Sequence, residues 1–165
     1  MDKPGATVNL NIAGAATGFT IAHNSTLAGM AINVTGTNGV SGVTSSGVAG
    51  VTISNNTISA SGTNNNVAAV QLIGGASTAT VSGNNFSATS TPGIYATALF
   101  TNNGTYTIAG NTFNASGGNI TRSLNLQNGP TFHPGSTGNT LASGGCFTSG
   151  VITGEIGLAG GATCP

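Results

Sequence analysis

This chain contains two carboxylate side chains, those of Asp2 and Glu155. Hydrolysis of a glycosidic bond needs such a pair, with the carboxyl groups about 5 to 10 Å apart. Asp2 and Glu155 stand near opposite ends of a 165-residue sequence. Catalysis by this pair therefore requires a fold that brings the two ends of the chain together.

Metal ligands and cations are equally sparse. Zn²⁺ takes three or four Cys or His ligands, and Ca²⁺ takes several carboxylate or carbonyl oxygens. His23 and His133 lie in separate parts of the sequence, and we expect each to be a solvent-facing turn residue. We predict no metal site and no cofactor. Arg122, the cation in the interior of the sequence, could anchor an anionic or sugar ligand or could be an ordinary solvated side chain.

Both cysteines, Cys146 and Cys164, lie in the last 20 residues, within Gly-rich sequence. A disulfide between them would fasten this segment, with about 3 kcal/mol of stabilisation in the chain-entropy model. Two unpaired thiols are the alternative. Because disulfides persist outside the cytoplasm, the favoured pairing predicts an extracellular or cell-surface protein.

Composition excludes two classes of partner. Charged residues make up 2% of the chain and the net charge is zero, whereas a soluble domain carries about 25% charged residues. The chain lacks the basic footprint of a nucleic-acid-binding protein. It also lacks the run of about 18 apolar residues that a membrane-spanning helix needs. We therefore expect no nucleic-acid partner and no membrane insertion.

Four segments repeat one pattern, and they define the elements that must position any site. They are VTISNNTISA from Val51, ATVSGNNFSA from Ala79, YTIAGNTFNA from Tyr106 and, with two residues inserted, TFHPGSTGNTLAS from Thr131. Their asparagines recur at intervals of 28, 27 and 28 residues, at Asn56, Asn84, Asn111 and Asn139. A fixed period of this length indicates one supersecondary unit stacked on itself.

Apolar and polar residues alternate inside each repeat, which is the period of a β-strand. Residues one period apart should therefore lie above one another in parallel strands, about 4.8 Å apart. An earlier copy from Phe19 places Asn24 32 residues before Asn56. With a second strand in each coil, the sequence predicts an all-β, parallel β-helix (β-solenoid) of about five coils of 27–32 residues.

We predict one domain over residues 1–165, with regular coils at about 18–145 and a Gly-rich C-terminal segment at 146–165. Several coils would then separate Asp2 from Glu155, and His23 from His133. Neither pair could act together within one subunit, so the sequence predicts that the protein is not an enzyme.

The repeat resembles the right-handed parallel β-helix of the pectate-lyase-like superfamily over roughly residues 18–145. In that family an asparagine at a sharp turn stacks on its neighbours in the coils above and below. The resemblance implies a ladder of Asn24, Asn56, Asn84, Asn111 and Asn139. Enzymes of the superfamily cleave polysaccharides with acidic calcium ligands and a basic residue, or with carboxylates on one strand face. This chain lacks those residues, so the resemblance implies a non-catalytic member.

The outward side of the first strand in each coil is the surface left for function. Strand alternation and stacking predict a flat, uncharged face there. The candidate binding residues are Thr20, Thr52, Ser54, Thr78, Thr80, Ser82, Thr105, Thr107 and Thr131. Threonine files of this kind resemble those of ice-binding β-solenoids, although exposed strand positions favour threonine in any case.

We predict an extracellular structural or adhesive module that acts through this surface. Its partner would be a glycan or a host or cell surface, or a second copy added end to end into a fibre. Tyr95 or Tyr106 could stack against a sugar, although alternation turns Tyr106 inward. Ice binding is the alternative, and a degenerate polysaccharide-binding relative of the β-helix lyases is a more remote one.

Overall fold

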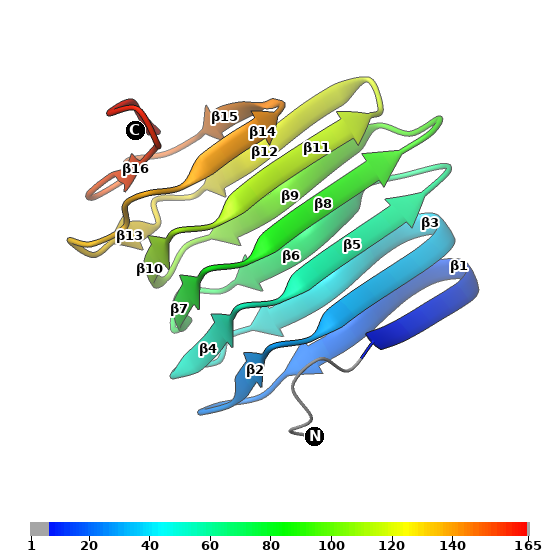
Figure 1. Ribbon diagram of the computed structural model, residues 1–165, viewed down its shortest axis with the longest axis horizontal. Helices are drawn as coiled ribbons and strands as arrows, with labels where there is room; N and C mark the ends of the chain where they lie inside the picture. Colours follow the sequence, from blue (N-terminus) through cyan, green and yellow to red (C-terminus); the bar gives the residue numbers. More distant parts are fainter. Residues whose placement is uncertain (1–6, 165) are drawn as a thin grey trace.

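A computed structural model describes residues 7–164. These residues form a parallel β-solenoid of about five turns, with no helix (Figure 1). The predicted fold class is therefore confirmed. From Val51 onward a full turn contains three strands rather than the two expected, and the strands of successive turns pair in parallel. Three faces consequently run along the solenoid.

The first face is a five-stranded sheet of short strands. Its members are β2 (Thr26–Ala28), β4 (Val51–Ser54), β7 (Thr78–Ser82), β10 (Thr105–Ala109) and β13 (Thr131–Phe132). These strands contain the repeat from which the period was predicted. Each is short because a sharp corner follows it.

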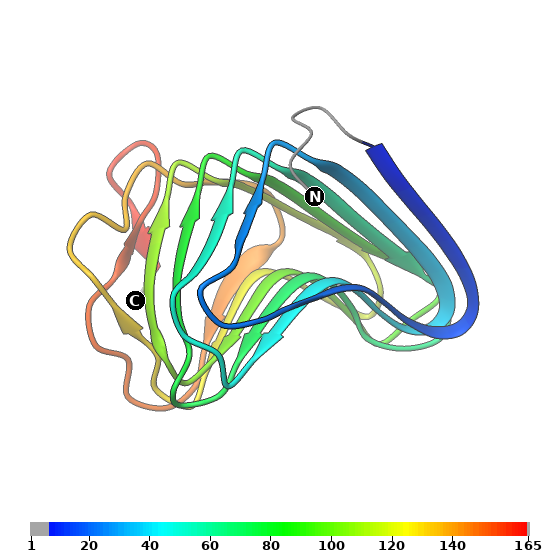
Figure 2. The ribbon, with the colours of Figure 1, turned by 90° about the horizontal axis from the view of Figure 1, so that it is seen from below.

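The second and third faces belong to one ten-stranded sheet. β1 (Thr7–Ile21) and β3 (Ala31–Ser46) run along both faces, and Figure 2 shows them wrapping around one end of the cross-section. In later turns the second face consists of β5 (Thr57–Gly62), β8 (Asn85–Ser90), β11 (Thr112–Gly117) and β14 (Thr140–Ser143). The third face consists of β6 (Val67–Ile73), β9 (Tyr95–Asn102), β12 (Ile120–Gln127) and β15 (Gly145–Thr148).

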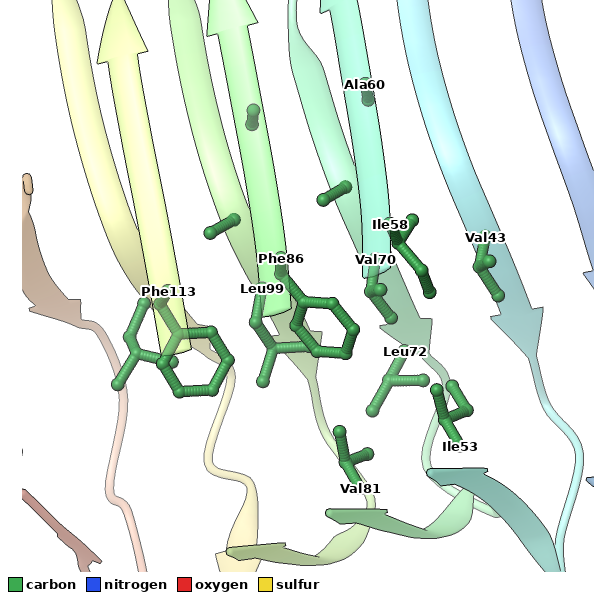
Figure 3. Close-up of a cluster of buried hydrophobic side chains, with 14 of the residues drawn as sticks. Val43, Ile53, Ile58, Ala60, Val70, Leu72, Val81, Phe86, Leu99 and Phe113 are labelled. Atoms are coloured by element: carbon green, nitrogen blue, oxygen red, sulfur yellow. The ribbon is translucent and has the colours of Figure 1, made fainter. Parts of the chain in front are cut away.

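The core is built from columns of like residues, because parallel register places the same repeat position in every turn side by side. Ile58 of β5, Phe86 of β8 and Phe113 of β11 pair in register and are fully buried (Figure 3). The rings of Phe86 and Phe113 lie 5.8 Å apart between centroids. Ile53 and Val81 form a second column behind the first face. The alternation predicted from the sequence therefore fills one continuous core.

An asparagine ladder runs along the corner between the first and second faces. Oδ1 of Asn84 accepts hydrogen bonds from the backbone N and from Nδ2 of Asn56, at 2.8 and 3.0 Å. Asn111 accepts the same two bonds from Asn84, and Asn139 accepts them from Asn111. All four residues are buried, and these bonds offset the loss of their hydration. The ladder is confirmed for these four asparagines.

Asn24 is not a member of the ladder, and that prediction was wrong. β2 pairs with β4 so that Leu27 lies beside Ile53, which places Met30 at the ladder position. The backbone N of Met30 donates to Oδ1 of Asn56 at 2.9 Å, 26 residues away, so the first interval is not 32 residues. Asn24 is exposed, with φ 55°, in the turn before β2.

The C-terminal segment covers the last turn of the solenoid. Cys146 and Cys164 form a disulfide, as predicted. β16 (Ile156–Gly157) pairs antiparallel with β17 (Thr163–Cys164), and Ile156 and Cys164 join the buried core. At the other end β1 pairs with β3 from Thr7, so the stack begins before residue 18. Asp2 lies outside the described residues.

Candidate functional site

The predicted first-face residues form two threonine columns, in a register that differs from the prediction at both ends. One column contains Thr52, Thr80 and Thr107, and it begins with Thr26 rather than Thr20. Thr20 was placed wrongly, because it lies on β1 and pairs with Thr44 of β3.

The neighbouring column contains Thr78, Thr105 and Thr131, so Thr131 lies two residues before the strand position predicted for it. Ser54 and Ser82 pair in a third column, as predicted. A shallow, open depression of about 220 Å³ lies over this face, lined by residues that include Gly50 and His133.

The second face carries three polar columns that sequence reasoning did not single out. The outward residues of β5, Thr57, Ser59 and Ser61, pair with Asn85, Ser87 and Thr89 of β8. The next turn continues these columns with Thr112, Asn114 and Ser116. No register shift interrupts the pairing from β3 through β5 and β8 to β11. This face is the more regular of the two uncharged surfaces.

The third face contains a groove of about 400 Å³. Its walls hold aromatic rings, amides and one guanidinium, from Gln71, Tyr95, Phe100, Arg122, Asn125 and Gln127. The volume lies in the range of small-molecule sites, which combine aromatic surface with a few polar groups. These residues come from β6, β9 and β12, which lie side by side.

Small residues form the floor of the groove. Ala68 of β6 pairs with Thr97 of β9; both line the hollow, and both are only 4% exposed. The residue that follows this floor position has no partner in the parallel pairing of any of these turns. It is Gly42, Ala69, Ala98 or Ser123 in successive turns. Figure 2 shows the third face arching inward across the cross-section. Larger side chains on both sides of this floor therefore form walls.

Arg122 is held between two rings. Its Cζ lies 3.5 Å from the ring centroid of Phe147 and 5.1 Å from that of Tyr95, within the range of cation–π contacts. Within residues 7–164 its guanidinium makes no ion pair and no hydrogen bond. Its N–H donors are therefore available to a bound molecule. Further along the same strand, Nε2 of Gln127 donates to Oδ1 of Asn125 at 3.0 Å, which fixes both amides.

The remaining predicted groups do not assemble into a catalytic or metal centre among the described residues. Nδ1 of His23 accepts a hydrogen bond from the backbone N of Ala49 at 3.0 Å. His133 and Glu155 line a separate hollow of about 240 Å³ at the C-terminal end. Within the described range no three His, Cys, Asp or Glu residues gather as metal ligands. No carboxylate lines the groove of the third face.

Sequence reasoning noted Tyr95 and Arg122 separately but did not bring them together. The groove residues lie on the second strand of each predicted coil, where Gln71, Phe100 and Asn125 pair in one outward column. No helix in the described part of the chain is long and apolar enough to span a membrane. Comparison with protein-family models, with curated proteins and with solved structures finds no match to the chain.

Proposed function

We propose that this protein is a non-enzymatic, extracellular β-solenoid that binds an extended glycan in the groove of the third face. The observation that carries the proposal is the makeup of that groove, with two aromatic rings, four amides and an unpaired guanidinium in about 400 Å³. Aromatic rings offer apolar faces to sugar rings, and amides both donate to and accept from hydroxyls. The absence of a carboxylate from its lining fits binding rather than hydrolysis.

The disulfide supports an extracellular location, because such bonds persist in oxidising compartments. The parallel solenoid and its asparagine ladder support a non-catalytic relative of the pectate-lyase-like β-helices. In this proposal the solenoid is the scaffold of an adhesin, and the groove is its contact with a glycan-bearing surface.

Titration calorimetry with four hexasaccharides, built from glucose, xylose, N-acetylglucosamine or galacturonic acid, tests the proposal. We expect at least one to bind, and we expect Phe100→Ala or Gln71→Ala to weaken that binding about tenfold through loss of one stacked ring or one bonded amide. Thr80→Ala on the first face is the matched control and should bind as the parent does.

Salt dependence then identifies the ligand class. Binding of a neutral sugar should be unaffected by salt, whereas binding of the acidic hexamer through Arg122 should weaken as salt screens the charge. If none of the four binds at millimolar concentration, or if Thr80→Ala abolishes binding while Phe100→Ala leaves it intact, the groove is not a glycan site.

Ice binding is the second candidate, and the second face favours it. Its three columns keep one register across β3, β5, β8 and β11, which gives hydroxyl and amide groups a regular spacing in two directions. Ser87→Tyr, at the centre of this face, should abolish inhibition of ice recrystallisation, while Phe100→Ala should not affect it. Absence of such inhibition in the parent protein at millimolar concentration would remove this candidate.

A further inference from the structure

One short strand carries both a disulfide cysteine and the ring that stacks on Arg122, a residue of the groove. In β15, Cys146 lies level with Leu124 of β12, a core residue, and Phe147 lies level with Asn125, a groove residue. Successive side chains of a strand point to opposite faces. Cys146 therefore points toward the core while Phe147 stands on the groove side, where it stacks on Arg122.

Few bonds other than the disulfide hold this strand. β15 has four residues and ends the order of the ten-stranded sheet, paired with β12 alone. That pairing shifts register between Arg122 and Leu124. Edge strands this short open easily when few buried contacts hold them. The disulfide supplies an anchor, because Cys164 is fully buried in the core.

We propose that the Cys146–Cys164 disulfide controls the groove by holding Phe147 against Arg122, so that reduction frees the guanidinium and weakens ligand binding. Phe147 is thus a positioning residue for Arg122. The inference rests on the proposed function of the groove. It adds that a dithiol reductant regulates the same site.

The redox step is thiol–disulfide exchange. A thiolate of the dithiol attacks Sγ of Cys146, which is only partly buried, and the Sγ–Sγ bond breaks as a mixed disulfide forms. The second thiol of the reductant then displaces Cys146 and closes its own disulfide. Two electrons pass from the reductant to the protein, and Cys146 and Cys164 each end as a protonated thiol.

Arg122 reports this link without any ligand. Lys3 and Arg122 are the two basic residues of the chain apart from histidine, so a single arginine Nε–Hε signal is expected in a ¹H–¹⁵N spectrum. In the oxidised protein the Phe147 and Tyr95 rings should displace the side-chain signals of Arg122 upfield. Dithiothreitol, or the double substitution Cys146→Ser with Cys164→Ser, should move them toward the values of an unstructured arginine.

Binding of the tightest of the four hexasaccharides is the second measurement. We expect reduction to weaken it about tenfold, as loss of a partly buried cation–π contact would. Phe147→Ala, which keeps the disulfide, should cause the same loss. Val151→Ala is the matched control on the same segment, because Val151 is 87% exposed and lies outside the groove.

The outcomes separate the two proposals. If the oxidised protein binds no hexasaccharide, the proposed function fails and control of it fails as well. If the oxidised and reduced proteins bind equally, or if the Arg122 signals do not move on reduction, only the redox inference is overturned. Loss of the whole β-sheet signal in circular dichroism on reduction would also overturn it, because the control would then not be local.

Discussion

Substitution of one ladder asparagine should lower the free energy of unfolding far more than substitution of an asparagine that only resembles it in sequence. Asn111→Ala deletes the acceptor of the Asn84 backbone N–H, which was bonded at 2.9 Å. It also deletes the bond from Nδ2 of Asn111 to the Val81 carbonyl at 2.9 Å. Asn84 is 3% exposed, so water does not replace the lost partner without rearrangement.

The magnitude follows from these groups. A buried amide without a partner costs about 1–3 kcal/mol, and each further lost bond about 1 kcal/mol. Asn111→Ala should therefore lower the free energy of unfolding by about 3 to 4 kcal/mol. For a domain of this size the melting temperature should fall by about 10 °C. Urea denaturation followed by circular dichroism measures the free energy directly.

Two controls make the test specific to the register. Asn24→Gly and Asn55→Gly alter exposed asparagines whose φ is 55° in both cases. Glycine adopts that conformation without strain, so each should change stability by less than about 0.5 kcal/mol. If Asn24→Gly is as damaging as Asn111→Ala, or if Asn111→Ala costs less than about 1 kcal/mol, the ladder and register described above are incorrect.

Three further predictions concern the core. Thr101 is fully buried and its hydroxyl has no partner among the described residues, so Thr101→Val should raise the free energy of unfolding by about 1 kcal/mol in urea titration; a loss of stability would contradict this. Burial raises the pKa of Tyr106 to about 12 from 10.0. Between pH 10 and 12 the unfolded chain therefore loses a proton that the native state keeps, and stability should fall by up to about 1.4 kcal/mol per pH unit, a fall that Tyr106→Phe should lack. A Cβ at Gly42 would lie 2.5 Å from the Ala69 carbonyl oxygen, whereas one at Gly75 would meet nothing within 4 Å. Gly42→Ala should cost about 1–3 kcal/mol and Gly75→Ala almost nothing by the same titration, and equal costs would refute the close packing at the bend.

The repeat alone predicted the parallel stack because its apolar and asparagine positions coincide turn after turn. In the first turn, where Met30 occupies the ladder position, the predicted register was wrong. The segment around Asn24 has the sequence pattern of a ladder turn. However, Leu27 and Ile32 pair with Ile53 and Ile58, and this pairing sets the register. Hydrophobic residues must face the core, whereas a turn asparagine can sit at any tight turn. In the first turn the apolar residues therefore predict the strand register better than the asparagine does.

The groove was harder to predict because its residues do not repeat. The outward column of the third face contains Thr44, Gln71, Phe100 and Asn125 in successive turns. These residues share neither size nor chemistry, so no period reveals them. The groove that they form also depends on the inward arch of this face. The arch arises where the strands bend at Gly42 and at the equivalent residues of later turns, and local propensity does not predict such a bend.

The near absence of charge and the position of Arg122 have one physical explanation. In this solenoid buried amides form hydrogen bonds with the equivalent amides of neighbouring turns, as Asn56, Asn84 and Asn111 show. Neutral amides need no counter-charge, so the ladder is stable without ion pairs. Arg122 is held by rings rather than by a carboxylate, and its free N–H donors fit the proposal that it binds a ligand.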